Sequence, residues 1–228
     1  MRPAAGTLFV GTSGFSYPEW RGHFYPAGLA GSKMLAHYAS RLNGVELNGT
    51  FYRSPAEAAL RTWAEAPVGF RFCLKGHRAL TYSAAAFDKL TVARDFARRV
   101  EVLGERLGPL LLQFPPVRKK DVALLDSLLE ALGRPVAAEF RDESWFDDEV
   151  SALLRSRGAA MVVTDDESWP QAPAGDYAFA YYRLRRDYSE EALAGWASRV
   201  PRDRDAYVFF KHTVEGPLRA VALARLLG

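Results

Sequence analysis

Polar and ionisable side chains in this chain recur at the points where short apolar runs end. They comprise three acids, four cations and two amides: Glu46, Glu139, Asp165, Lys75, Arg141, Arg183, Lys211, Asn48 and Gln113. Arginine and lysine can hold a phosphate or carboxylate, and a buried glutamate or lysine can transfer protons. We therefore expect binding of, and acid–base chemistry on, a small anionic compound, phosphorylated or sugar-like. The candidate catalytic residues are Glu46, Glu139, Lys75 and Asp165.

Two other interpretations of these residues remain open. Glu46, Glu139 and Asp165, helped by His77 or His212, offer ligands that Mg²⁺ or Mn²⁺ accepts, which would make the protein a divalent-metal-dependent hydrolase. The neighbouring cations oppose a metal by Coulomb repulsion, so a divalent metal is disfavoured as cofactor and no residue is assigned as a metal ligand. A purely structural ion-pair network is the third reading, because buried charges are costly unless they are paired.

Aromatic residues and local basic clusters suggest a function of another class. Tyr17 and Trp145 follow expected strands and could stack on a sugar or base, whereas most other loop aromatics are expected to pack. Arg185 and Arg186 are adjacent, so single-stranded nucleic acid is the alternative partner. The formal charge of +3 and the pI near 9.0 support it only weakly, because acidic residues are interspersed with the basic ones.

The elements that must position these groups follow a regular alternation. Short runs rich in β-branched and aromatic residues alternate with segments of helical period, the pattern of βα units around a parallel sheet. The expected strands are 8–11, 45–50, 69–75, 110–114, 136–140, 160–164, 178–184 and 206–210. Eight such strands predict an α/β fold, a (β/α)8 TIM-type barrel forming a single domain over residues 1–228. In such barrels reactive groups lie where strands end.

Side-chain parity and capping residues refine this prediction. Alternation along the strands places Glu46 with Asn48, and Glu139 with Arg141, on the inner face. Helices are expected to begin near the Ser54–Pro55 pair, after Asp147 and after Ser189. The segment 165–176 carries no helix signal, so the barrel should be irregular around its sixth helix, and residues 12–31 form a long first loop.

Composition indicates the class of protein and its cellular location. Hydrophobic residues make up 49% of the 228 and charged residues 25%, values typical of a globular protein. Cys73 is the lone cysteine, the first residues do not resemble a signal peptide, and no apolar run approaches the roughly 20 residues that cross a bilayer. We expect a cytoplasmic protein with no membrane partner. The sequence leaves its oligomeric state unknown.

Several motifs, in combination and in order, resemble the YecE-like family, catalogued as domain of unknown function family 72. They are GTSGFSYPEW (11–20), VELNGTFY (45–52), FCLKGH (72–77), LLLQFPP (110–116) and AEFRDESW (138–145). The resemblance implies a TIM barrel with a pocket but no established reaction. It points to these ligand-binding residues: Ser13, Tyr17, Trp20, Asn48, Tyr52, Gln113, Arg141, Trp145 and Arg183. Lys211 is added from its place at the end of the last strand.

The chain departs from the family pattern in two places. Arg185 and Arg186 stand where the family typically has His-Gly, and the segment before Tyr188 looks shortened. Lys211 and His212 stand where the last strand usually ends in Asn-Asn. Ligand contacts from the last two strands are therefore expected to differ from those of the family.

Overall fold

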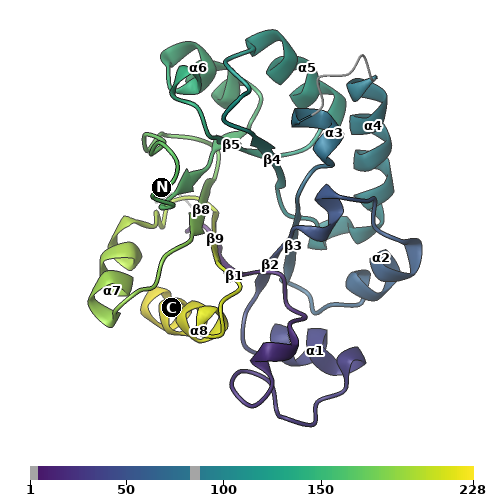
Figure 1. The fold of residues 1–228 in the computed structure, drawn as a ribbon, viewed down its shortest axis with the longest axis vertical. Coiled ribbons are helices and arrows are strands. Elements are labelled where there is room, and N and C mark those ends of the chain that lie inside the picture. The colour runs from purple at the N-terminus through teal and green to yellow at the C-terminus, as the bar shows by residue number, and fades with distance from the viewer. Residues whose placement is uncertain (1–4, 83–87) are drawn as a thin grey trace.

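The computed structural model describes residues 5–82 and 88–228 (Figure 1). Every pair of neighbouring strands in the described residues is parallel. The strands are β1 (Leu8–Ser13), β2 (Gly44–Leu47), β3 (Arg71–Leu74), β4 (Leu110–Phe114), β5 (Val136–Phe140), β6 (Ala160–Met161), β7 (Val163–Thr164), β8 (Ala180–Leu184) and β9 (Ala206–Phe210). The expected α/β class with a parallel sheet is confirmed.

The strands form two sheets and not one closed barrel. The larger sheet has the order β3-β2-β1-β9-β8-β7, and the smaller has the order β4-β5-β6. The expected strand 160–164 is interrupted at Val162, so its first part pairs with β5 and its second part with β8. On the other side only isolated bridges, such as Lys75 with Leu111, join β3 to β4. Pairing at both junctions is too short for a continuous ladder, so the structure shows two sheets and the expected closed barrel is not confirmed.

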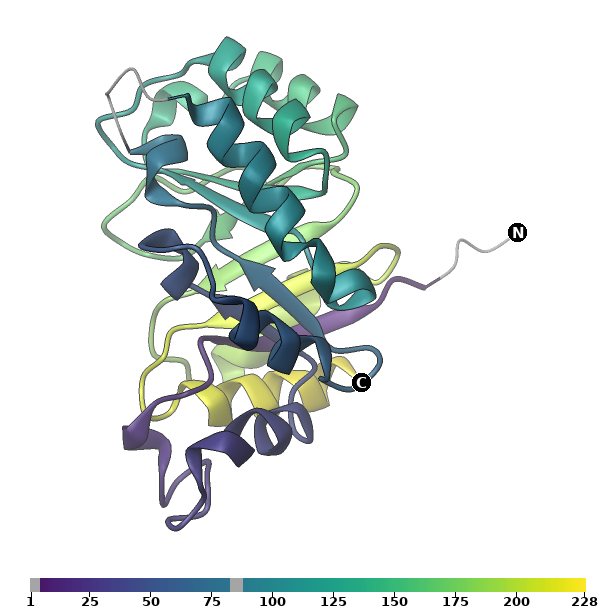
Figure 2. The same ribbon diagram turned by 90° about the vertical axis from the view of Figure 1, so that its right-hand side faces the viewer.

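Helices cover the outside of the strands and share one hydrophobic core with them. They are α1 (Met34–Ala39), α2 (Glu57–Ala64), α3 (Arg78–Thr81), α4 (Lys89–Val100), α5 (Val122–Leu132), α6 (Asp148–Ser156), α7 (Glu190–Arg199) and α8 (Gly216–Leu227). Short 3-10 helices add Pro18–Trp20, Gly31–Lys33, Gly49–Phe51, Glu101–Arg106 and Glu143–Trp145. Seen from the side, α8 lies across β1 (Figure 2). Among the described residues, no helix is long and apolar enough to cross a membrane.

Two of the three expected helix starts are confirmed. The Asp147 carboxylate accepts a hydrogen bond from the Val150 amide, and the Ser189 hydroxyl accepts one from the Ala192 amide. By contrast, α2 begins at Glu57 after an extended Ala56 and has no side-chain cap. Pro55 favours an extended backbone at Ser54, which places the serine too early to cap the helix. As expected, the described segment between Thr164 and Ala180 contains no helix.

Aromatic side chains fill the interior toward the amino ends of the strands. Phe9 of β1 stacks on Tyr207 of β9 with ring centres 4.8 Å apart, and Tyr181 of β8 stacks on the same Tyr207 at 6.1 Å. All three side chains are buried. The polar groups are thereby confined to the carboxyl ends of the strands.

Candidate functional site

Arg183 of β8 joins two buried glutamates from distant strands. Its Nε and Nη2 donate to the Glu46 carboxylate at 2.9 and 2.8 Å, and its Nη1 donates to the Glu139 carboxylate. The side chains of Glu46 and Glu139 are 0% and 1% exposed, and that of Arg183 is 7% exposed. Because buried charges must be paired, this three-residue bridge fixes the centre of the site.

Glu46 of β2 accepts hydrogen bonds from several further donors. The Ser13 hydroxyl lies 2.7 Å from its Oε1, the Tyr181 hydroxyl 3.0 Å from its Oε2, and the Asn48 amide 3.1 Å from Oε1. Arg185 adds a bond of 3.1 Å to Oε1, and its other terminal nitrogen donates to the Ser13 hydroxyl at 2.7 Å. Both Glu46 oxygens are saturated, so this carboxylate is a structural anchor for the residues around it.

Lys75, just after β3, lies at the other end of the network. Gln113 of β4 donates its amide to Glu139 at 2.8 Å, which turns its Oε1 toward the Lys75 ammonium, 2.7 Å away. The Tyr82 hydroxyl donates to the same Oε1 at 3.1 Å. Lys75 Nζ also lies 4.0 Å from the centre of the Phe51 ring. Among the described residues Lys75 forms no ion pair with a carboxylate.

Arg141 extends the site toward solvent. Its Nε lies 3.3 Å from Glu139 Oε1, its guanidinium stacks over the Trp169 ring at 4.4 Å, and its side chain is 21% exposed. With Lys75, Arg183 and Arg185 it brings four cations against two carboxylates. The network therefore carries an excess of two positive charges.

Electrostatics separate the roles of the ionisable groups. Burial would raise the pKa of Glu46, but Arg183 and Arg185 outweigh it and hold the pKa well below its usual range. The pKa of Glu139 is also lowered, because burial, which would raise it, is outweighed by the positive charges of Arg183 and Arg141. Burial and the nearby Arg183 lower the pKa of Lys75 to about 8. Lys75 is thus the member of the network whose protonation changes closest to neutral pH.

The strand register explains why these side chains meet. Ser13 of β1 pairs with Glu46 of β2, and Gln113 of β4 pairs with Glu139 of β5. Register partners in parallel strands point to the same face, so alternation along each strand delivers these groups to the interior. The predicted convergence of Glu46, Lys75, Glu139 and Arg183 is present in the structure.

Asp165 does not join this network. Thr164 pairs with Arg183, so Asp165, one position later, turns to the opposite face. Its carboxylate accepts hydrogen bonds from the Arg185 backbone amide at 2.6 Å and from the Tyr188 hydroxyl. It lines a pocket of about 640 Å³ on the outer side, with Tyr182, Trp196 and others. Asp165 therefore lies apart from the two glutamates and holds the segment after β8, and its catalytic role stays a prediction.

Two predicted ligand-binding tryptophans are packed inside the protein. Trp145 is 0% exposed, stacks on Phe140 at 4.4 Å and donates its indole N–H to the Arg118 carbonyl. Trp20 is also 0% exposed and donates to the Thr213 carbonyl. Neither ring offers a surface to a ligand, so both expectations are corrected in favour of core packing.

The other predicted contacts lie around the edge of the site. The Tyr17 hydroxyl donates to the Ser13 carbonyl at 2.7 Å, and its half-buried ring stacks on His212. Tyr52 is 70% exposed and packs only its edge on Phe51. Lys211 is exposed and forms no side-chain hydrogen bond or ion pair with the described residues. These three therefore stand outside the hydrogen-bonded network.

Sequence reasoning missed three members of the network, Arg185, Tyr181 and Tyr82. Arg185 and Tyr181 share the parity of Arg183 along and beyond β8, so alternation would have placed them on the same inner face. Tyr82 follows α3, where no strand alternation signals its position. Arg185 was interpreted as a possible nucleic-acid contact beside Arg186. Only Arg185 turns inward; Arg186 pairs with Glu167 on the surface.

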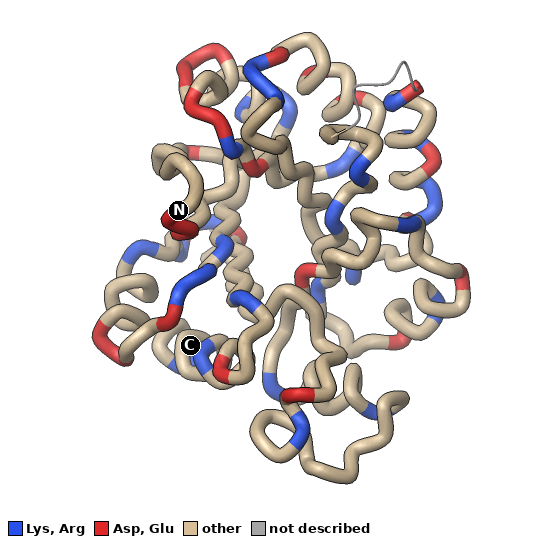
Figure 3. Tube along the Cα trace, viewed as in Figure 1, with Lys and Arg blue, Asp and Glu red and all other residues tan. Residues whose placement is uncertain are grey.

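Lys and Arg residues are interspersed with Asp and Glu residues along the Cα trace (Figure 3). In the described part of the chain, no three His, Cys, Asp or Glu side chains cluster in a way that could hold a metal ion. Glu46 and Glu139 each direct oxygens at Arg183, which occupies the space between them. The residues present therefore do not fit a carboxylate metal centre.

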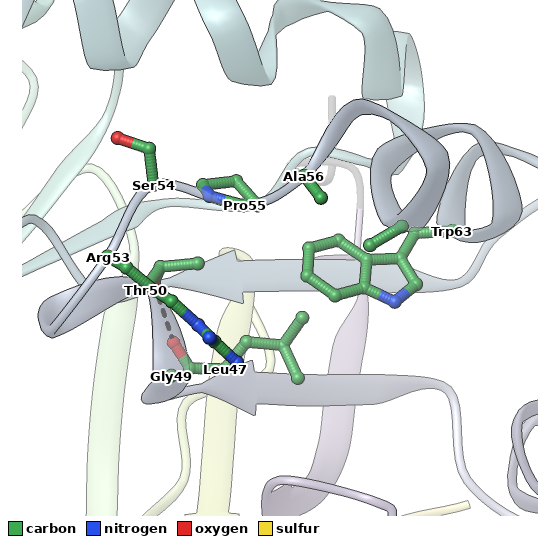
Figure 4. A pocket seen from close by; sticks show the side chains of 9 residues that line it. Leu47, Gly49, Thr50, Arg53, Ser54, Pro55, Ala56 and Trp63 are labelled. Carbon is green, nitrogen blue, oxygen red and sulfur yellow. Dashed lines mark hydrogen bonds between the residues drawn. The ribbon is translucent and has the colours of Figure 1, made fainter.

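A separate pocket of about 470 Å³ lies on the outer side of β2 (Figure 4). Leu47, which follows Glu46 and so faces the other way, lines it together with Trp63, Pro55 and the rim residue Arg53. None of its lining residues was predicted as a site residue. The pocket is distinct from the charged network.

Comparison with known proteins places this arrangement in a family. Residues 9–228 match the family described as "Protein of unknown function DUF72". The UPF0759 protein YecE of Escherichia coli strains O157:H7 and K12 is 29% identical over 167 residues, which is 69% of this chain and 59% of that protein. The chain thus matches about three fifths of the length of these curated relatives.

Two solved structures share the fold. The crystal structure of a DUF72 family protein from Thermotoga maritima has a TM-score of 0.84 and 30% identity, with 97% of this chain and 99% of that chain covered. A DUF72 family protein from Enterococcus faecalis has a TM-score of 0.74 and 18% identity, with 97% and 98% covered. On the match over residues 9–228 and the likeness to the Thermotoga structure, this chain belongs to the DUF72 family.

Proposed function

We propose that this protein binds a small anionic compound, phosphorylated or sugar-like, at the carboxyl ends of its strands and performs acid–base chemistry on it. The observation that carries the proposal is the excess of two positive charges in a largely buried network. Arg183 and Arg185 bind the carboxylate of Glu46, whereas Lys75 and Arg141 keep donors free. A dianionic phosphate or a carboxylate at Lys75 and Arg141 would neutralise the excess.

The acid–base role falls to Lys75, with Glu139 as its partner across Gln113. Glu46 is saturated by donors and its pKa is held low, so it supplies charge and position but has no free lone pair for a proton. Lys75, with a pKa of about 8, can donate or accept a proton near neutral pH. Arg141 and Trp169 at the rim would orient the ligand.

We further propose that the two sheets together form the barrel of a single (β/α)8-type domain over residues 1–228. The sheets meet at two weakly paired seams, one between β6 and β7 and one between β3 and β4. The chain runs directly from β6 to β7 through Val162, whose amide donates to the Ala138 carbonyl at 2.9 Å. At the opposite seam, the Gly76 amide donates to the Leu111 carbonyl at 2.8 Å. An experimental structure with an open gap at either seam would contradict this.

Isothermal titration calorimetry tests the binding proposal. Inorganic phosphate and glucose 6-phosphate should release or absorb heat on binding to the wild type, whereas glucose should bind more weakly. Arg141→Ala should weaken phosphate binding about 10- to 100-fold, because a charge-assisted hydrogen bond contributes about 1.5–3 kcal/mol. Lys119→Ala is the matched control, because Lys119 is exposed and pairs with Asp142 outside the network. Equal affinities in both variants, or no binding of any anion, would overturn the proposal.

A further inference from the structure

The contacts of Lys75 fix the direction of its amine, which a nucleophile requires and a simple anion-binding lysine does not. Its Nζ donates to Gln113 Oε1 at 2.7 Å, and the Phe51 ring covers it at 4.0 Å. Gln113 cannot turn away, because its amide nitrogen is bound to Glu139. One N–H of Lys75 is therefore fixed in direction, and the remaining valences of the nitrogen are left for a ligand.

The surroundings of Lys75 favour the neutral amine. The residue is 8% exposed and forms no ion pair with the described residues. Its burial and the repulsion by Arg183 and Arg141 outweigh the attraction by Glu139 and Glu46. With a pKa of about 8, roughly a quarter of Lys75 is unprotonated at pH 7.5, against about 0.1% of an ordinary lysine. Only the unprotonated amine can attack a carbonyl carbon.

A proton donor stands beside the amine. The Tyr82 hydroxyl lies 3.1 Å from the same Gln113 oxygen that Lys75 contacts, so both donors converge on one acceptor. Tyr82 is half-buried, and burial raises its pKa, which keeps it protonated at neutral pH. It can therefore donate a proton to an oxygen that leaves the carbon attacked by Lys75.

We propose that Lys75 forms an imine with an aldehyde or ketone that carries a phosphate or carboxylate, the anion lying against Arg141. This inference rests on the proposed anion site and names its substrate class. The Lys75 nitrogen attacks the carbonyl carbon, the carbon–oxygen bond breaks, and the oxygen leaves as water after gaining a proton from Tyr82 and one from the amine. A protonated carbon–nitrogen double bond remains. Tyr82 regains its proton from solvent, so no oxidant or reductant is consumed.

Reductive trapping tests this on the whole chain. The protein is incubated at pH 7.5 with glyceraldehyde 3-phosphate and sodium cyanoborohydride, and labelled lysines are located by peptide mass spectrometry. Lys75 should be labelled at least tenfold faster than Lys119, an exposed lysine of the same chain that reports non-specific reaction. Labelling of Lys75 no faster than that of Lys119 would overturn the proposal.

Two variants and a second aldehyde define the substrate class. Lys75→Arg keeps the positive charge but cannot form an imine, so it should lose the fast adduct at position 75. Arg141→Ala should slow labelling by glyceraldehyde 3-phosphate at least fivefold more than it slows labelling by uncharged glyceraldehyde. If phosphate binds and Lys75 stays unlabelled, only the imine proposal fails. If phosphate does not bind and Lys75 stays unlabelled, the anion site fails with it.

Discussion

Glu46 and Lys75 are both buried and ionisable, but their surroundings act on them in opposite ways. Glu46 accepts hydrogen bonds from two arginines, a serine, a tyrosine and an asparagine, which stabilise its charged form. Lys75 receives one amide oxygen and one ring, and two arginines repel it. At the scale of single residues, the site is therefore a fixed anion beside a cation that is readily neutralised.

The depressed pKa of Lys75 predicts a pH dependence of stability. The folded protein holds this proton less tightly than the unfolded chain, so the unfavourable contribution is complete below about pH 8 and is relieved as pH rises from about 8 to 10.5. The wild type should therefore gain roughly 2 to 3 kcal/mol relative to Lys75→Met across that range. Urea unfolding of both proteins at pH 7, 8.5 and 10 measures it. A difference that stays constant with pH would contradict the shift.

Removing the Glu46 carboxylate predicts a large loss of stability. Glu46→Ala leaves Arg183 and Arg185 without their principal partner in a buried place, which should cost about 3–5 kcal/mol. Because the pKa of Glu46 is held below its usual value of 4.5, the carboxylate stabilises the fold fully at neutral pH, and this contribution is lost progressively as the pH falls below about 4.5. The measurement is guanidinium unfolding at pH 7.

The control for that experiment is Glu57→Ala. Glu57 pairs with Arg61 on the exposed face of α2, where both side chains are 71% exposed, so its removal should change little. If the two variants lose similar stability, the buried network does not contribute as its geometry implies.

At the scale of elements, the carboxyl end of β7 holds the segment after β8. Asp165 binds the Arg185 amide and the Tyr188 hydroxyl, and through Arg185 it positions a donor to Ser13 and Glu46. Since the described segment 165–179 contains no helix, this carboxylate replaces part of the support that a helix would give. Asp165 is therefore a positioning residue.

Asp165→Ala should loosen that segment without removing the anion site. Loss of the buried hydrogen bonds should cost about 1–3 kcal/mol and speed amide exchange at Arg185 and nearby residues. Phosphate binding should weaken less than in Arg141→Ala, because Asp165 touches neither Lys75 nor Arg141 in this structure. Hydrogen exchange with mass spectrometry, together with calorimetry, checks both parts. Unchanged exchange at Arg185 would show that other contacts hold the segment.

The sequence predicted most of this architecture because the governing signals are local. The strands 110–114, 136–140 and 206–210 have the expected bounds, and strand parity brought Glu46, Gln113, Glu139 and Arg183 together. Parity failed where a strand broke: the expected strand 160–164 divides at Val162, and Asp165 faces outward. Burial of Trp145 could not be predicted, since it depends on Phe114 and Phe140 from two separate strands.

Sheet closure also lies beyond local signals. Pairing of β3 with β4 depends on the backbone spacing between two strands that are about 35 residues apart in the chain. In this structure their pairing consists of isolated bridges. Composition and periodicity predict that strands exist, but not how completely the last ladders form. The α/β class was therefore predictable, and the division into two sheets was not.

At the scale of the whole molecule, charge distribution distinguishes a small anion from nucleic acid. The chain carries a formal charge of +3, and Lys and Arg residues are interspersed with Asp and Glu residues along the Cα trace (Figure 3). Several surface cations form ion pairs, as in Lys120 with Asp147 and Arg157 with Asp126. A nucleic-acid surface instead needs many phosphate contacts along an unpaired basic stripe.

Salt dependence should therefore be shallow. A small ligand with one phosphate has no condensed counterion atmosphere to release, so its affinity should fall by about tenfold or less when monovalent salt rises from 50 to 200 mM. A nucleic acid that makes six or more phosphate contacts would lose roughly a thousandfold or more. We expect inorganic phosphate to follow the shallow course and a fluorescent single-stranded 12-mer to show no saturable binding at 150 mM salt. Tight oligonucleotide binding with a steep salt dependence would contradict the small-anion proposal. If Arg186→Ala abolished that binding and Arg141→Ala did not, the protein would bind nucleic acid on its outer surface, because Arg186 lies outside the network and Arg141 lies within it.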